Sequence, residues 1–353
     1  MIRLCFLLFG LLLAACTTPP LPTLPDRRLP AAVQLAPFEE ADQIPPQIAR
    51  LPFDDGRAYA ILVQIPAPAV VDLSDPDRAR RGLLRFLDPL ASVRAGTLIG
   101  HTMAGWRCAD GTLGLASKSG DDGNVGLRMV LRGWGIAAFL SDYADGHLYE
   151  PAQIPDRHRR VLRQGRARIL AVEIDEAGCQ AIRRALVRYR SHPDTPERHF
   201  SMLRDPAALQ GDGCAEFALW LLGQGGAFVP VLPELRRPVP LRDSFVGLGR
   251  PVSGPVTPFR LPGLNTPVPL ARLLRGDWSA GRMVGQVEIL DLELLRVLID
   301  RAYARTGPVP PRLAAGDTQA QRVAAAADRW LARTPRTVPA RIGAARAVVL
   351  SRR

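Results

Sequence analysis

The chain has 353 residues, of which 47% are hydrophobic and 23% are charged, as in an ordinary globular protein. This length is enough for one large domain or two smaller ones. The formal net charge is +12 and Lys118 is the only lysine, but the arginines are scattered among aspartates and glutamates. We therefore expect no nucleic-acid partner, and at most a weak preference for anionic lipid headgroups or cell-wall polymers.

The first residues predict export and lipidation. An apolar run too short to span a bilayer follows Arg3, and it ends in Leu13-Ala14-Ala15-Cys16. This stretch resembles a bacterial lipoprotein signal with its lipobox; the alternative is an ordinary signal peptide with a chance cysteine. The resemblance implies removal of residues 1–15 and acylation of Cys16, with membrane lipid as the partner. Thr17 stands where an inner-membrane retention signal would have aspartate, which favours the outer membrane, facing the periplasm.

Residues 16–50 are expected to form a proline-rich tether, because proline favours an extended spacer over a packed element. A folded domain is expected over residues 51–226, followed by a C-terminal extension of unknown role over 227–353. In that extension the sequence predicts loops over 227–283.

Periodicity predicts the regular elements. In chain order they are strands at 58–65, 97–106, 112–116, 146–151 and 168–174, and helices at 78–87, 175–189, 214–223, 286–304 and 314–333. We expect Ser74 or Asp75 to cap the first helix. The stretch 127–142 is expected to be an irregular insertion, and the arginine-rich end from Pro335 to be mobile.

Cys214 is the candidate nucleophile. Two glycines precede it in Gly211-Asp212-Gly213-Cys214, and apolar residues at helical spacing follow. This pattern places Cys214 at a helix N-terminus, where unpaired backbone N–H groups and the helix dipole favour a thiolate. The alternative is a small buried core cysteine.

His101 is the candidate base, because a histidine on a buried strand that faces a helix-start cysteine can take its proton. His199 is the fallback base, since it is the histidine nearest to Cys214 in the sequence. The remaining histidines are expected to be solvated: His147, His158 and His192.

The cysteine count leaves two arrangements open. Once Cys5 leaves with the signal and Cys16 carries lipid, Cys108, Cys179 and Cys214 remain. In an oxidising compartment an odd count suggests one bridge and one free thiol. A disulfide between Cys108 and Cys179 would leave Cys214 free, and three unpaired buried cysteines are the alternative.

The order of these stretches, with the histidine strand before the cysteine helix, resembles the circularly permuted branch of the papain-like fold. That branch includes permuted NlpC-like bacterial hydrolases and lecithin:retinol acyltransferase-like enzymes. The matching residues are Gly100-His101 and the run 213–218, GCAEFA, in which Gly213 replaces the asparagine common in the family. The resemblance covers about residues 90–225. It implies an α+β fold in which a small antiparallel sheet packs on the cysteine-bearing helix.

The resemblance also implies roles for the candidate residues. Cys214 would attack an acyl carbonyl, and His101 would act as general base and later protonate the leaving group. Glu150, at the end of a strand, is favoured as the group that orients His101. The runners-up for that role are Ser117, Ser119 and Asp122. The backbone N–H of Cys214 is the expected oxyanion donor.

These expectations describe a lipid-anchored cysteine hydrolase or acyltransferase that acts on an amide or ester bond of the envelope, with peptidoglycan peptides as the leading substrate. The alternative is a non-catalytic envelope lipoprotein that uses the same fold for binding or scaffolding. No cysteine and histidine spacing matches a zinc site, and no glycine pattern matches a phosphate loop, so no metal or cofactor is expected.

Overall fold

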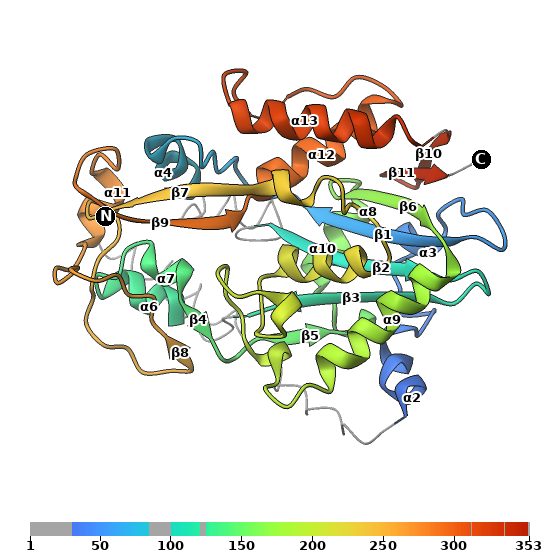
Figure 1. Ribbon diagram of the computed structural model, residues 1–353, viewed down its shortest axis with the longest axis horizontal. Coiled ribbons are helices and arrows are strands. Elements are labelled where there is room, and N and C mark those ends of the chain that lie inside the picture. The colour runs from blue at the N-terminus through green and yellow to red at the C-terminus, as the bar shows by residue number, and fades with distance from the viewer. Residues whose placement is uncertain (1–29, 85–99, 121–124, 312, 335, 352–353) are drawn as a thin grey trace, which may run out of the picture.

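The protein is described by a computed structural model that places residues 30–84, 100–120, 125–311, 313–334 and 336–351 (Figure 1). The expected signal peptide, Cys16 and Asp122 lie outside these residues. In the described part of the chain, no helix combines the length and the apolar character needed to cross a membrane.

A mixed sheet of seven described strands forms the centre of the structure, in the order β10-β11-β6-β1-β2-β3-β5. The strands are β1 (Ala58–Ile65), β2 (His101–Arg107), β3 (Leu113–Ser119), β5 (His147–Tyr149), β6 (Arg168–Ile174), β10 (Arg336–Ile342) and β11 (Ala345–Ser351). Neighbouring strands are antiparallel except β11 and β6, which are parallel. The α+β class is confirmed. The sheet is larger than the small antiparallel sheet that we expected, because the C-terminal residues supply two of its strands.

The helices and the smaller strands surround this sheet. The helices are α2 (Ala31–Leu35), α3 (Pro46–Ala49), α4 (Pro76–Leu84), α6 (Val125–Leu131), α7 (Ala137–Leu140), α8 (Asp156–Arg163), α9 (Glu176–Arg190), α10 (Cys214–Gln224), α11 (Leu270–Arg275), α12 (Leu292–Ala304) and α13 (Thr318–Leu331). The short 3-10 helices are η1 (Ala36–Phe38), η3 (Pro151–Gln153), η4 (Pro196–Arg198), η5 (Pro206–Ala208) and η6 (Leu232–Leu235). Two further strand pairs join β4 (Asp142–Tyr143) to β8 (Val256–Thr257) and β7 (Arg236–Arg242) to β9 (Met283–Leu290).

The two faces of the sheet pack against different helices. Successive side chains of a strand point to opposite faces. Ala60 and Leu62 of β1 therefore join a core with α9, α10, α12 and α13, whereas Ile61 and Val63 join a core with α8 and residues 44–51. We call these faces the α10 face and the α8 face. Which face a strand residue points to decides which site residues can meet.

Local patterns predicted the central elements well. The bounds of β1 and β6 match the expected strands, and α9 and α10 lie where helices were predicted. Asp75 accepts a hydrogen bond from the backbone N–H of Arg78, at 2.8 Å, as expected for the residue that caps α4. Asp175 caps α9 by accepting from the backbone N–H of Gly178, at 2.6 Å.

Several expectations about the flanking segments were wrong. The tether does not extend to residue 50, because Leu35 and Phe38 are buried in the core of the α10 face. The stretch 127–142 is not irregular but contains most of α6 and all of α7. Its apolar side chains pack with Trp134 and Trp278 in a third core, beside the arm formed by β7 and β9 (Figure 1).

Three C-terminal expectations also need correction. The segment 227–283 is not all loop, because it includes β7. The helix expected at 286–304 begins only at Leu292, since residues up to Leu290 belong to β9 and pair with β7. The arginine-rich end forms β10 and β11 instead of a mobile tail, and β11 is held by parallel pairing with β6.

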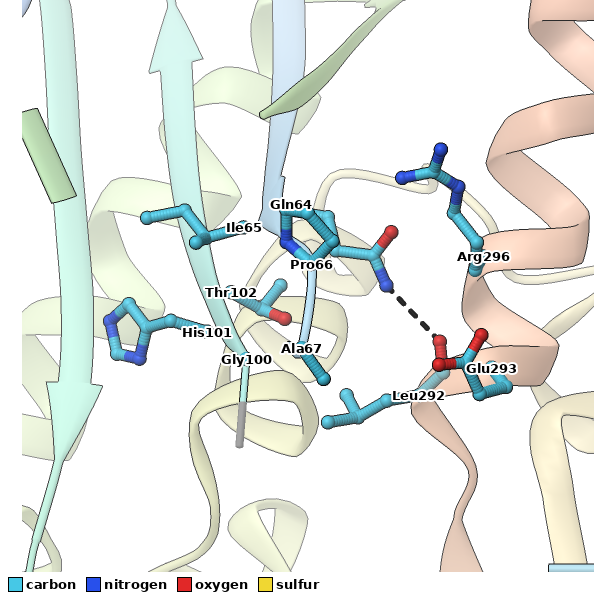
Figure 2. A pocket seen from close by; sticks show the side chains of 10 residues that line it. All are labelled: Gln64, Ile65, Pro66, Ala67, Gly100, His101, Thr102, Leu292, Glu293 and Arg296. Atoms are coloured by element: carbon cyan, nitrogen blue, oxygen red, sulfur yellow. Dashed lines mark hydrogen bonds between the residues drawn. The ribbon is translucent and has the colours of Figure 1, made fainter. Parts of the chain in front are cut away.

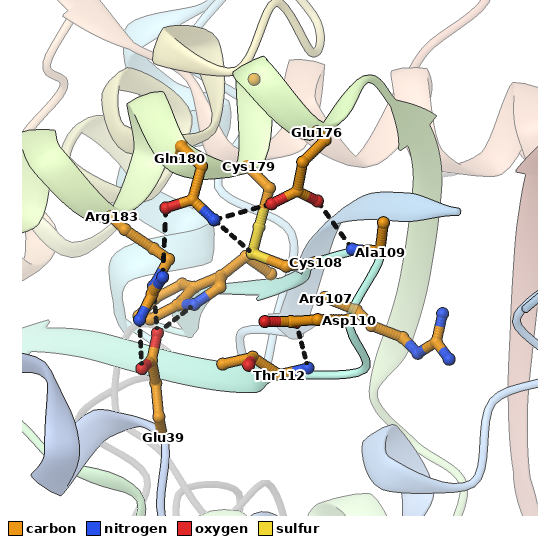
Figure 3. Close-up of a disulfide and its surroundings, with 12 residues drawn as sticks. Glu39, Arg107, Cys108, Ala109, Asp110, Thr112, Glu176, Cys179, Gln180 and Arg183 are labelled. Atoms are coloured by element: carbon orange, nitrogen blue, oxygen red, sulfur yellow. Dashed lines mark hydrogen bonds and ion pairs between the residues drawn. A yellow bond between two sulfur atoms is a disulfide. The ribbon is translucent and has the colours of Figure 1, made fainter. Parts of the chain in front are cut away.

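A disulfide joins Cys108 to Cys179, as one of the two open arrangements predicted (Figure 3). It connects the end of β2 to the first turn of α9. Figure 3 shows a polar cluster beside it, in which the Arg183 guanidinium donates to both carboxylate oxygens of Glu39 at 2.7 and 2.9 Å. This cluster ties α9 to the end of η1. Cys214 is the free cysteine among the described residues.

Candidate functional site

Cys214 is the first residue of α10, as the glycine pattern predicted. Gly211 has a φ of +101°, and a Cβ there would lie 2.4 Å from the Cβ of His199, so the turn before the helix requires glycine. The Glu216 carboxylate accepts a hydrogen bond from the backbone N–H of Gly213, at 3.5 Å. The side chain of Cys214 is buried, with 9% of the residue exposed.

The surroundings of Cys214 keep its thiol protonated. Burial raises the pKa of Cys214 to about 11, and the nearby carboxylates of Glu216 and Asp212 add to this increase. Hydrogen bonds from the backbone N–H groups of Thr102 and Ala215 oppose it and are too weak to restore a normal pKa. At neutral pH the thiolate fraction is therefore very small, although the thiol lies at a helix N-terminus.

His101 lies on the opposite face of the sheet from Cys214. It begins β2, and its side chain points to the α8 face, where its Nε2 forms a hydrogen bond with the Ser117 hydroxyl. Its ring stacks on the ring of His158 from α8, with 4.6 Å between the centroids. Thr102, the next residue, points to the α10 face. Figure 2 shows the His101 and Thr102 side chains leaving the strand in opposite directions.

The structure therefore does not bring His101 and Cys214 together. The physical reason is the two-residue period of a strand, because a shift of one residue moves a side chain to the other face. The sequence motif placed His101 on the strand beside α10, but it could not determine to which face of the sheet the side chain points. Burial, together with the charges of His158, Arg157 and His147, holds the pKa of His101 well below its usual range.

The other candidate residues are dispersed. Glu150 does not orient His101; its carboxylate lies 4.0 Å from the Arg190 guanidinium of α9. Ser117, a runner-up, forms a hydrogen bond with His101. Ser119 stands at the end of β3, in register with His147 of β5.

The fallback base, His199, is engaged elsewhere. Its Nδ1 lies 3.3 Å from the Asp142 carboxylate, which also accepts from Arg204 at 2.5 Å. The expectation that three histidines are solvated is wrong for two of them. His147 and His158 are 5% and 4% exposed and lie near His101 on the α8 face. His192 remains partly exposed.

Sequence reasoning missed a row of polar side chains that crosses the α10 face. Gln64 of β1 pairs with Arg168 of β6 on one side and with Thr102 of β2 on the other. Lys118 of β3 comes one position after Ser117, which pairs with Met103, so it lies beside Thr102. A signal was present in the sequence, because Gln64 interrupts the otherwise apolar end of β1 and Lys118 is the only lysine.

Asp212, two residues before Cys214, forms a fully buried ion pair with Lys118 of β3. The Lys118 ammonium lies 3.3 Å from the Asp212 carboxylate and donates to the Tyr189 hydroxyl and the Pro196 carbonyl, both at 2.6 Å. Tyr189 in turn donates to Asp212 at 3.0 Å. Burial raises the pKa of Asp212 to about 6, and the charge of Lys118 opposes part of that rise. This network fixes the turn that leads into α10.

A pocket opens at one end of the polar row, between the ends of β1 and β2 and the start of α12 (Figure 2). Its lining residues are Gln64, Ile65, Pro66, Ala67, Gly100, His101, Thr102, Leu292, Glu293 and Arg296. Thr102 thus joins two features, because its side chain borders the pocket while its backbone N–H contacts the Cys214 thiol. In the described part of the chain, no group of three or more His, Cys, Asp or Glu side chains is placed to hold a metal ion.

No family model, curated protein or solved structure matches the chain. The likeness to the permuted papain-like fold therefore rests on the short sequence motifs alone.

Proposed function

We propose that this chain is a lipid-anchored protein of the bacterial cell envelope whose folded domain works by binding and not by cysteine catalysis. The observation that carries the proposal is the separation of the two candidate residues. Cys214 starts α10 on one face of the sheet, and the His101 side chain points to the other, the α8 face. A cysteine nucleophile needs a base within hydrogen-bond reach and a lowered pKa. Cys214 has a raised pKa, and the His101 ring is held by Ser117 and His158.

The second candidate is a cysteine hydrolase of the permuted papain-like kind, acting on amide or ester bonds of the envelope. One observation favours it: Cys214 starts a helix and receives hydrogen bonds from two backbone N–H groups, of Thr102 and Ala215. Such donors stabilise a thiolate or an oxyanion. This function would need a base on the α10 face, and His101 could serve only if its side chain crossed the sheet.

Alkylation kinetics separate the two functions. The full chain in detergent is treated with iodoacetamide across a pH series without reductant, and labelling of Cys214 is followed by mass spectrometry in the wild type and in His101→Ala. We expect slow labelling that increases only as the pH approaches about 11, with the same profile in both proteins. The urea-unfolded chain is the control, and its labelling should follow the free-thiol pKa of about 8.5. Fast labelling below that pH, lost in His101→Ala, would overturn the binding proposal and support the hydrolase.

Membrane attachment through Cys16 is a separate part of the proposal and rests on the lipoprotein-like signal. Several acyl chains on one cysteine would anchor the protein far more firmly than a single chain does. Cys16→Ala should move the protein from the outer-membrane fraction to the periplasmic fraction of a Gram-negative host. If the variant stays in the membrane fraction, the anchor lies elsewhere.

A further inference from the structure

Exposed apolar side chains gather on α6 and α7. Six large apolar side chains are exposed in the described part of the chain, and three of them lie on these two helices: Leu127, Leu131 and Phe139, with exposures of 40%, 53% and 41%. Val125 and Met129 of α6 are buried in the third core. Since successive residues of a helix are about 100° apart, Leu127 and Leu131 lie on the opposite side of α6 and point away from that core.

The same part of the structure carries positive charge without acidic residues. The stretches 125–141 and 244–276 contain six arginines and no aspartate or glutamate. All six arginines are exposed. Acidic residues occur only beyond the ends of the stretches, and two of these, Asp142 and Asp243, each contact an arginine that lies outside them. The two stretches together thus carry half of the net charge of +12.

Three of these arginines lie beside the end of α6. The side chain of Arg132, which directly follows α6, donates to the Pro251 carbonyl at 2.9 Å, and the backbone N–H of Arg250 donates to the Arg132 carbonyl at 3.0 Å. The Arg260 guanidinium lies over the Trp134 ring, 5.8 Å from its centroid, and the Trp134 Nε1 donates to the Arg250 carbonyl at 2.9 Å. We call the resulting surface the basic apolar patch; it consists of Leu127, Leu131, Arg132, Phe139, Arg250 and Arg260.

The combination of arginines with exposed apolar side chains indicates the kind of partner. Like charges held close together repel each other, so an anion that binds them is favoured. A soluble anionic polymer would engage the arginines alone. An anionic bilayer engages both groups, because its phosphates attract the arginines and its acyl boundary accepts the apolar side chains.

A second basic surface, on α8, lacks this combination. Arg160 and Arg163 of α8 are exposed, but none of the six exposed apolar side chains counted above lies on that helix. In Figure 1, α6 and α7 lie at the left of the molecule and α8 lies at the right. The two surfaces can therefore be changed separately.

We propose that the basic apolar patch lies on the anionic phospholipid surface of the membrane that holds the chain, with Leu127 and Leu131 at the acyl boundary and the arginines at the phosphates. This inference rests on the proposed membrane anchor and adds the face of the domain that meets the bilayer. Pro30, the first described residue, follows Cys16 by 14 residues. An extended chain of that length reaches about 45 Å, which is comparable with the width of a domain of this size.

Hydrogen–deuterium exchange of the full chain in lipid nanodiscs tests the contact. One set of discs contains phosphatidylcholine alone, and the other contains equal parts of phosphatidylcholine and phosphatidylglycerol. Exchange is followed by mass spectrometry in peptides that cover residues 125–134. We expect exchange to be at least about three-fold slower in the anionic discs, because each cation near such a surface strengthens the attachment by about five-fold. Added salt should remove the difference.

Charge-reversal variants show which cations make the contact. The double variant Arg132→Glu, Arg250→Glu should exchange at the same rate in both kinds of disc. The matched control is Arg160→Glu, Arg163→Glu, which changes the net charge equally on α8 and should retain the full slowing of the wild type. Melting temperatures in detergent check that both variants are folded.

A second pair of variants tests the apolar part of the patch. Leu131→Ser keeps every charge and should weaken the contact by about ten-fold, because burial of one leucine side chain is lost. Val229→Ser is the matched control, since Val229 is 50% exposed and lies in the segment after α10, outside the patch. It should behave as the wild type does.

Three results would overturn the proposal. They are equal exchange of the wild type in the two kinds of disc, loss of the slowing in the α8 control, and equal slowing when soluble polyphosphate is added to the neutral discs. The last result would assign the patch to an anionic polymer. The membrane anchor is judged separately, by the fractionation of Cys16→Ala. Failure here with normal fractionation would remove the lipid-facing patch alone, whereas Cys16→Ala that stays in the membrane fraction would remove the proposed anchor.

Discussion

Glu216, two residues after Cys214, makes the free energy of unfolding depend on pH. Burial raises the pKa of Glu216 to about 8, with Arg236 opposing and Asp212 assisting. Between the ordinary value of 4.5 and about 8, the folded protein keeps this proton and the unfolded chain releases it. The free energy of unfolding therefore falls as the pH rises through this window.

Glu216→Gln should remove that dependence, since its amide oxygen can still accept from the Gly213 N–H. Relative to the wild type, the variant should gain up to about 5 kcal/mol of stability between pH 4.5 and pH 8.5. Urea unfolding at a series of pH values measures this gain. Glu288→Gln, at an exposed position of β9, is the control and should follow the wild type. Parallel curves for Glu216→Gln would show that the carboxyl is ionised in the folded protein.

His158 produces the opposite trend on the α8 face. Burial, helped by the charge of Arg157, lowers the pKa of His158 to about 4. As the pH falls from 6.5 towards 4, the unfolded chain binds a proton that the folded protein excludes, so stability is lost in this window. His101 acts in the same direction, because its pKa is also lowered.

His158→Phe keeps an aromatic ring against His101 and removes the titrating group. The loss of stability between pH 7 and pH 4 should be about 3 kcal/mol smaller than in the wild type. Thermal unfolding followed by circular dichroism tests this, with the partly exposed His192→Phe as the control. An equal loss in His158→Phe and the wild type would mean that His158 is not buried as a neutral ring.

Among the elements, α9 depends on a covalent link to β2. The Cys108–Cys179 disulfide closes a loop with a sequence separation of 71 residues. In the chain-entropy account, such a link stabilises the folded state by about 4 kcal/mol. The double variant Cys108→Ala, Cys179→Ala should lose stability of this order in urea unfolding, and reductant should bring the wild type close to it. If reductant has no effect on the wild type, the bridge is absent or inaccessible in solution.

Some helices and strands could be predicted from the sequence, and others could not. The strands β1 and β6 and the helices α9 and α10 were found because their apolar spacing and caps are local signals. β11 was missed because its burial depends on parallel pairing with β6, about 180 residues earlier in the chain. The helix predicted at 286–304 included the second part of β9, because apolar residues continue across Asp291, where the strand ends and α12 begins. His101 was predicted on the correct strand. The face to which its side chain points changes with a shift of one residue, and it is determined by the register of β2 with β1 and β3.

At the scale of the whole molecule, one buried arginine connects α12 and α13 to the arm formed by β7 and β9. Arg237 of β7 donates to Asp291 at 2.7 Å and to Asp317 at 2.6 Å, and its side chain is only 6% exposed. These aspartates also cap α12 and α13, since each accepts from backbone N–H groups in the first turn of its helix. The start of both helices and the position of β7 are thus fixed by the same three side chains.

Arg237→Ala should therefore destabilise the protein by about 3–5 kcal/mol, because it leaves two carboxylates buried without their cation. The matched control is Arg301→Ala, which breaks an exposed ion pair between α12 and α13, with exposures of 44% and 49%, and should cost less than about 1 kcal/mol. The triple variant Arg237→Met, Asp291→Asn, Asp317→Asn removes the charges together and keeps side chains that can cap. It should recover much of the loss, because the cost comes from isolating buried charge and not from losing attraction. If the triple variant is as unstable as Arg237→Ala in urea unfolding, the ion pairs themselves hold the arm against the two helices.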